Sequence, residues 1–159
     1  MTSPAANVTG LRQTRGGSGL RANSFSAAVM LLVEYGLGIW VNLYLQVPAS
    51  DHGKGTFAAF GAAVAHGPVA LAVHALLGTL LLVTAVALTV RAALARQAAT
   101  TVVSAVALLA VIAAWLSGAR FTGDAASGAS FGMAIATAVA LLGYVLILFV
   151  PGQTGGRGQ

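Results

Sequence analysis

The chain has 159 residues, of which 58% are hydrophobic and only 7% are charged, and its mean hydropathy is +0.89. Soluble domains carry about 25% charged residues, so this composition predicts an integral membrane protein. Cysteine is absent, which excludes disulfides, iron–sulfur clusters and thiolate zinc sites.

Four apolar runs are long enough to cross a bilayer, which takes about 20 residues in a helix. In lipid the backbone cannot be hydrated, so each run must be helical. Short connections between neighbouring runs predict an all-α fold, an antiparallel up-down four-transmembrane-helix bundle. The runs cover about residues 25–47, 68–90, 101–119 and 129–150, and the polar ends, residues 1–24 and 151–159, are predicted to be disordered tails.

Basic residues are distributed unevenly between the two predicted faces of the membrane, which explains the net charge of +5 without a nucleic-acid partner. Six lie on the face that carries both ends of the chain, and two lie on the opposite face. By the positive-inside rule, both termini are predicted to be cytoplasmic in a multi-pass protein of the cell membrane. The six are Arg12, Arg15, Arg21, Arg91, Arg96 and Arg157, and the two are Lys54 and Arg120.

Glu34 is the one acidic residue inside a predicted span, close to the middle of the first run. A buried charge is costly in a bilayer, so we expect a protonated carboxyl or a polar partner at similar depth. One interpretation makes Glu34 a proton relay or a quinone contact, and the other makes it a protonated acid that joins two helices by a hydrogen bond. The candidate partners are Tyr144, Thr84, Thr89 and Ser104.

The longest connection between two runs, residues 48–67, reads PASDHGKGTFAAFGAAVAHG. Its apolar part, about residues 56–66, is predicted either to lie as a short helix in the outer interface or to extend the second span outward. The Gly-Pro pair that follows should break or bend the chain at the start of the second span. Asp51, His52 and His66 could in principle bind copper or zinc, but their spacing matches no known metal pattern.

His74 lies in the second run, about 9 Å below the outer boundary set by Pro68, at about 1.5 Å per helical residue. An ionisable residue at that depth is a functional hypothesis by default, and neutral imidazole is a common metal ligand. Gly78, one turn along the same face, leaves room for a flat cofactor or a neighbouring helix. His74 is therefore interpreted either as a ligand to heme iron or as a core histidine that donates to a carbonyl group or to Asn42.

Met133, in the fourth run, is predicted to lie at a depth close to that of His74. His/Met ligation of heme iron is chemically sound, whereas core filling is the alternative role of the methionine. His66 is a competing ligand if the chain folds back at the Gly-Pro pair. Asn42 matches the depth of His74 and could orient its imidazole. Glu34 is predicted to lie about 12 Å deeper than His74, too far to ligate the same iron.

The segment VHALLG at residues 73–78, the outward link before it and the mirrored outer end of the fourth run resemble four-helix heme-binding membrane modules. These modules include the b561-type cytochromes and one half of heme A synthase. The resemblance covers about residues 25–150, as topology plus one histidine. It implies heme b held by His74 and Met133 in the outer half of the bilayer, electron transfer, and exchange with a quinone pool. The chain departs from those families in its fourth run, which offers Met133 and no histidine.

Two functions are compatible with these features. The first is heme binding in membrane electron transfer. The second is a non-enzymatic accessory or assembly subunit of a larger membrane complex or homo-oligomer, in which His74 and Glu34 serve helix packing. Faces of small residues in the first and fourth runs favour close helix contact and thus the second function. No P-loop, dinucleotide fingerprint, nucleophile elbow or zinc-protease motif is present in the sequence.

Overall fold

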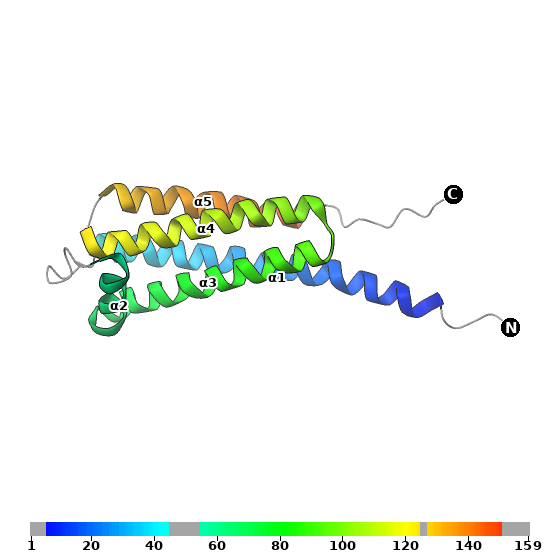
Figure 1. Cartoon of the computed structure of the whole chain (residues 1–159), viewed down its shortest axis with the longest axis horizontal. Helices are drawn as coiled ribbons and strands as arrows, with labels where there is room; N and C mark the ends of the chain where they lie inside the picture. The colour runs from blue at the N-terminus through cyan, green and yellow to red at the C-terminus, as the bar shows by residue number, and fades with distance from the viewer. Residues whose placement is uncertain (1–5, 45–54, 125–126, 151–159) are drawn as a thin grey trace.

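The computed structural model describes residues 6–44, 55–124 and 127–150. Four long helices lie side by side along the long axis of the molecule (Figure 1). A short helix, α2, lies at one end, called the α2 end, and the α3–α4 connection lies at the opposite end, called the turn end (Figure 1). The helices are α1 (Ala6–Tyr44), α2 (Thr56–His66), α3 (Val69–Leu94), α4 (Ala98–Asp124) and α5 (Ser127–Phe149).

The outer surface of the four long helices is apolar. Large hydrophobic side chains point outward along their length, as in Leu43 with 66% exposure and Phe149 with 76%. Exposed apolar surface of this extent suits hydrocarbon better than water. The predicted all-α fold is confirmed, and so are four helices long and apolar enough to cross a membrane. They are Gly19–Tyr44, Val69–Leu94, Ala98–Phe121 and Gly128–Phe149.

The N-terminal segment differs from its prediction. We predicted a disordered tail over residues 1–24, but α1 begins at Ala6 and continues without a break into the first apolar run. Extending an existing helix adds one hydrogen bond for each residue fixed, so a segment of weak helix propensity can continue a helix that the apolar run has already nucleated. The predicted C-terminal tail, residues 151–159, lies outside the described residues.

The interior is packed unevenly along the molecule. The half near the turn end holds a cluster of small and medium side chains, among them Ala27, Ala85 and Ala107, that surrounds the fully buried Tyr144. In this half α4 and α5 approach so closely that a Cβ atom at Gly143 would lie 2.9 Å from the Cβ of Ala107. Alanine and glycine at helix contacts allow such short distances between backbones. The half near the α2 end is less filled and contains the site described below.

The helix predicted at about residues 56–66 is present as α2, Thr56–His66. It packs against the α2 end through Ala59 and Ala63, which are fully buried. The rings of Phe57 and Phe60 lie 6.3 and 5.1 Å from the ring of Trp115 in α4. α2 therefore closes this end of the bundle and is attached to α4 by aromatic contacts.

Gly67 is required by the connection between α2 and α3. Its N–H donates to the carbonyl of Ala63, and a Cβ atom at Gly67 would lie 2.3 Å from that same oxygen. Replacing Gly67 with alanine should therefore displace α2 and destabilise the protein by about 1–3 kcal/mol, the usual cost of overpacking. Thermal unfolding in detergent measures the loss, and Gly61→Ala, where no atom lies within 4 Å, is the matched control in the same helix.

Candidate functional site

A cavity of about 400 Å³ lies between the four long helices in the half near the α2 end. Its volume falls in the range of about 300–1,000 Å³ that is typical of small-molecule and cofactor sites. Its walls are mainly apolar, and no lysine or arginine lines it in the part of the chain that the structure describes. The polar or sulfur-containing residues that line it are Glu34, Tyr35, Asn42, His74, Trp115, Ser130, Met133 and Thr137.

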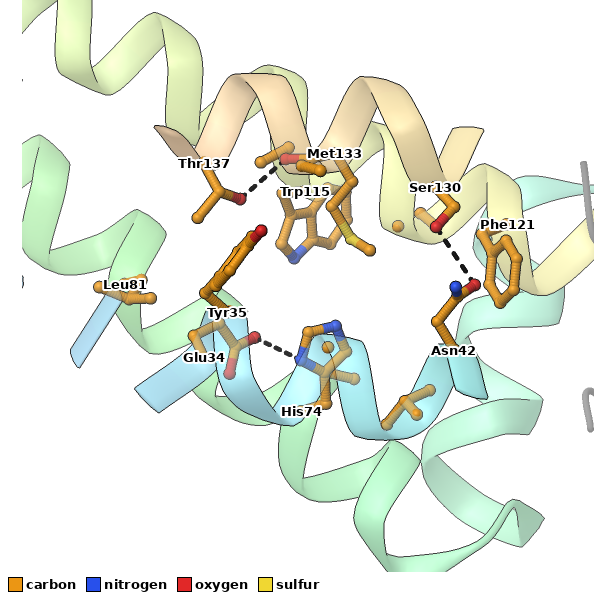
Figure 2. Close-up of a pocket in the computed structure, with 18 of the residues that line it drawn as sticks. Glu34, Tyr35, Asn42, His74, Leu81, Trp115, Phe121, Ser130, Met133 and Thr137 are labelled. Carbon is orange, nitrogen blue, oxygen red and sulfur yellow. Dashed lines mark hydrogen bonds and ion pairs between the residues drawn. The ribbon is translucent and has the colours of Figure 1, made fainter. Parts of the chain in front are cut away.

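Glu34 of α1 and His74 of α3 are in direct contact inside this cavity (Figure 2). The distance between Oε1 of Glu34 and Nδ1 of His74 is 2.9 Å, and the two side chains are only 11% and 15% exposed. The ring nitrogen is not aligned for a well-formed hydrogen bond, so the attraction is mainly electrostatic. The pair links α1 to α3 and gives each of two buried ionisable side chains a polar partner.

This contact corrects our predicted depth of Glu34. We expected Glu34 about 12 Å deeper than His74, at about 1.5 Å per residue, and with partners other than the histidine. Each depth was counted along its own helix from an assumed end of the span, and the contact shows that these ends do not share one level. The carboxylate also takes the place beside the imidazole that we considered for Asn42.

Two glycines make room for the Glu34–His74 pair. A Cβ atom at Gly38 of α1 would lie 3.2 Å from Cε1 of His74, and one at Gly78 of α3 would lie 3.0 Å from Oε1 of Glu34. Each side chain therefore packs against the bare backbone of the opposite helix. The space at Gly78, which we expected to admit a flat cofactor or a neighbouring helix, is taken by the carboxyl group of Glu34 and borders on Trp115.

His74 and Met133 face each other across the cavity (Figure 2). With Nδ1 next to Glu34, the second ring nitrogen, Nε2, is directed toward the cavity and toward the methionine of α5 (Figure 2). The methionine sulfur packs on Gly118 of α4, where a Cβ atom would lie 3.4 Å from it. An imidazole nitrogen and a thioether sulfur thus line the same cavity from opposite walls.

No protein-family model, curated protein or solved structure matches this chain. The function therefore has to be inferred from the residues of the cavity. Among the described residues, no group of three or more histidine, aspartate and glutamate side chains is arranged to hold a metal ion. A heme already supplies most of the ligands of its iron, so it needs only one or two ligands from the protein and no group of three.

Asn42 and Ser130 form the rim of the cavity near the α2 end. Oγ of Ser130 donates to Oδ1 of Asn42 over 3.2 Å, which connects α5 to α1 (Figure 2). Asn42 thus lines the same cavity as His74 but is bonded to a different helix. His66 is exposed at the end of α2 and does not line the cavity, and Asp51 and His52 lie outside the described residues.

Trp115 is a cavity residue that sequence reasoning missed. Tryptophan near the end of a span is common at the membrane interface and requires no ligand there, so its position gave no reason to place it in a site. In the structure, Nε1 of Trp115 donates to Oγ1 of Thr79 over 3.2 Å, and the indole lines the cavity from α4 (Figure 2). Its location one turn before Gly118, the glycine that receives the methionine sulfur, is the sequence signal that could have identified it.

One carboxylate oxygen has no partner. Oε2 of Glu34 is buried and makes no hydrogen bond to any described residue. Buried polar atoms are almost always satisfied, and an exception in a cavity calls for a ligand, a proton or water. The site therefore combines an oriented imidazole, a thioether and an unsatisfied carboxyl oxygen within an apolar space.

Proposed function

We propose that this protein binds heme b within the membrane and takes part in electron transfer, and that His74 and Met133 would hold the heme. The observation that carries the proposal is that these two side chains face each other across a cavity of about 400 Å³. The bound heme would exchange one electron at a time between ferric and ferrous iron.

The contact with Glu34 supports a ligand role for the imidazole. Histidines that bind metals usually place their other ring nitrogen against a carboxylate or a carbonyl, which fixes the ring and makes the ligating nitrogen more basic. Nδ1 of His74 is 2.9 Å from Oε1 of Glu34, and this leaves Nε2 for the cavity. Glu34 would thus position the ligand without touching the iron.

The surroundings of the thioether support the second ligand. The sulfur of Met133 lies against Gly118, so no side chain of α4 would separate it from the cavity. Methionine opposite histidine raises the reduction potential of heme iron relative to ligation by two histidines. We therefore propose an electron carrier of comparatively high potential, for which a membrane quinone is a suitable exchange partner.

The proposal includes an orientation. We propose an antiparallel bundle in the cell membrane with both termini cytoplasmic, because the basic residues at the turn end include Arg21, Arg91 and Arg96. The heme would then lie in the outer half of the bilayer, below α2. Asn42 and Ser130, at the rim of the cavity near α2, are the polar groups available to the heme propionates.

The visible spectrum of the purified protein tests the proposal. Heme should be supplied during expression, and the oxidised and reduced protein should show a Soret band and, on reduction, α and β bands. His74→Ala should lose these bands and recover them when imidazole is added, because the small ligand can occupy the space of the missing ring. Met133→Leu should shift the bands without abolishing heme binding.

His66→Ala is the matched histidine control and should leave the spectrum unchanged, because His66 is exposed outside the cavity. Circular dichroism verifies that each variant remains helical. A wild-type protein without a Soret band after expression with heme would overturn the proposal.

A packing role is the second candidate, in which the chain is an accessory subunit without a cofactor. Its supporting observation is the close fit of Gly38 and Gly78 around His74 and Glu34, which makes the pair a specific contact between α1 and α3. In that case His74→Ala should lower stability while no variant shows any heme spectrum.

A further inference from the structure

The wall of the cavity formed by α1 and α5 is also part of the outer surface. Tyr35 and Ile39 of α1 and Phe131 of α5 line the cavity, yet they are 45%, 44% and 69% exposed. All three lie within helices that are long and apolar enough to span a membrane. The surface that they share with the cavity would therefore face the acyl chains of the bilayer.

The other helix pairs are closed beside the cavity by close contacts. α1 meets α3 through the Glu34–His74 pair, and α3 meets α4 through the hydrogen bond from Trp115 to Thr79. α4 and α5 interlock where Gly118 receives the sulfur of Met133. We call each line of contact between two neighbouring helices a seam. Opening any of these three seams would break a polar or tightly packed contact.

The two ends of the bundle are also closed. At the α2 end, Phe60 and Ala63 of α2 cover the cavity, and the ring of Phe60 packs at a tilt against that of Trp115. At the turn end, the alanine-rich cluster around Tyr144 is tightly packed. A flat molecule the size of a porphyrin could not pass either end without unfolding part of the bundle.

The seam between α1 and α5 has a different construction. Among the described residues, its side-chain hydrogen bonds lie at its two extremes: Ser130 donates to Asn42 near the α2 end, and Arg21 donates to the carbonyl of Leu148 near the turn end. Between these contacts lie the half-exposed cavity residues Tyr35 and Ile39. The α1–α5 seam is thus joined by hydrogen bonds on both sides of the cavity, and mainly apolar side chains lie between these bonds.

We infer that the cavity is loaded from the bilayer, sideways through the seam between α1 and α5, by heme dissolved in the membrane. The inference rests on the proposed function, because it takes heme as the occupant. Heme is flat and largely apolar, so it partitions into lipid and can approach a lipid-facing seam directly. Among the described residues, the side-chain hydrogen bond that joins α1 to α5 at the α2 end of the seam is the exposed one between Asn42 and Ser130, so opening beside the cavity would break this bond and leave that of Arg21 in place.

The seam can be locked at that bond. The chain contains no cysteine, so Asn42→Cys with Ser130→Cys introduces two thiols that a short bifunctional thiol reagent can bridge. The chain has two tryptophans, and Trp40→Phe leaves Trp115 as the only fluorophore of this kind, located in the cavity wall. Heme quenches tryptophan fluorescence, so its arrival in the cavity can be followed in liposomes that contain the full chain.

Loading is compared before and after bridging the thiols. We expect the bridge to slow the quenching of Trp115 by added heme by about an order of magnitude, because a gating motion limits the filling of a closed site. The same double-cysteine protein without the reagent is the control, because it carries both substitutions and differs only in the bridge. If bridged and unbridged proteins load equally fast while both acquire the heme spectrum, the inference is wrong and the proposed function stands.

A second quencher separates the inference from the proposed function. Lipids brominated on their acyl chains should quench Trp115 in the unbridged protein and quench it less after bridging, whether or not heme binds. If heme never binds but this difference is found, the lateral opening is supported and the heme proposal fails. If brominated lipids quench the bridged and unbridged proteins equally, the lateral opening is overturned.

Discussion

Replacing Glu34 with alanine should lower the free energy of unfolding by about 2 kcal/mol, the typical cost of leaving a buried polar group without its partner. The change leaves the 15% exposed imidazole of His74 unpaired in an apolar cavity. It should also weaken heme binding by about 10- to 100-fold, as is usual when the group that orients a histidine ligand is removed. Unfolding in a denaturing detergent and heme titration measure the two effects separately.

Two further variants show whether the effect comes from the pair. Glu34→Gln keeps an oxygen acceptor near Nδ1 and should retain most of the stability and affinity. The double variant Glu34→Leu with His74→Leu replaces both partners by apolar groups and should recover stability, since buried ion pairs can often be exchanged for well-packed hydrophobic residues. If the double variant is less stable than either single variant, the pair is not the source of the stability.

Replacing Gly38 with leucine should destabilise the protein by about 1–3 kcal/mol and prevent heme binding. A Cβ atom at this position already lies 3.2 Å from Cε1 of His74, so the larger side chain must displace the imidazole from Glu34 and enter the cavity. The measurement combines thermal unfolding with the heme spectrum of each variant.

Gly36 provides the matched control for this substitution. It lies two residues earlier in the same helix, and no atom would lie within 4 Å of a Cβ atom there. Gly36→Leu should change the free energy of unfolding by less than about 0.5 kcal/mol, as is usual for surface substitutions, and should leave heme binding intact. If both substitutions reduce stability and heme binding equally, then Gly38→Leu acts on α1 as a helix and not by displacing His74.

The helices could be predicted from the sequence because long apolar runs in a chain with so few charges leave helix as the available structure. The short helix α2 was predicted for a similar reason, from an apolar segment bounded by a Gly-Pro pair. The extension of α1 back to Ala6 was not predicted, because a polar, glycine-containing segment has no apolar period that marks it as helix.

The candidate site could be predicted only in part. His74 and Met133 were placed near each other because both lie a short distance inside their own spans. The contact of His74 with Glu34 was missed because counting residues along a helix gives depth but not the relative shift between two helices. Trp115 was not predicted to line the cavity, because a tryptophan near the end of a span suits the membrane interface and a cavity wall equally well.

The uneven packing along the molecule divides it into a rigid stem and a compliant head. In the stem, alanine and glycine contacts such as Ala107 with Gly143 hold the four helices in a fixed register. In the head, the helices surround a hollow, and fewer buried contacts resist their separation. Opening the head would then cost less free energy than unfolding the stem, so the proposed occupant could be exchanged while the four helices stay together.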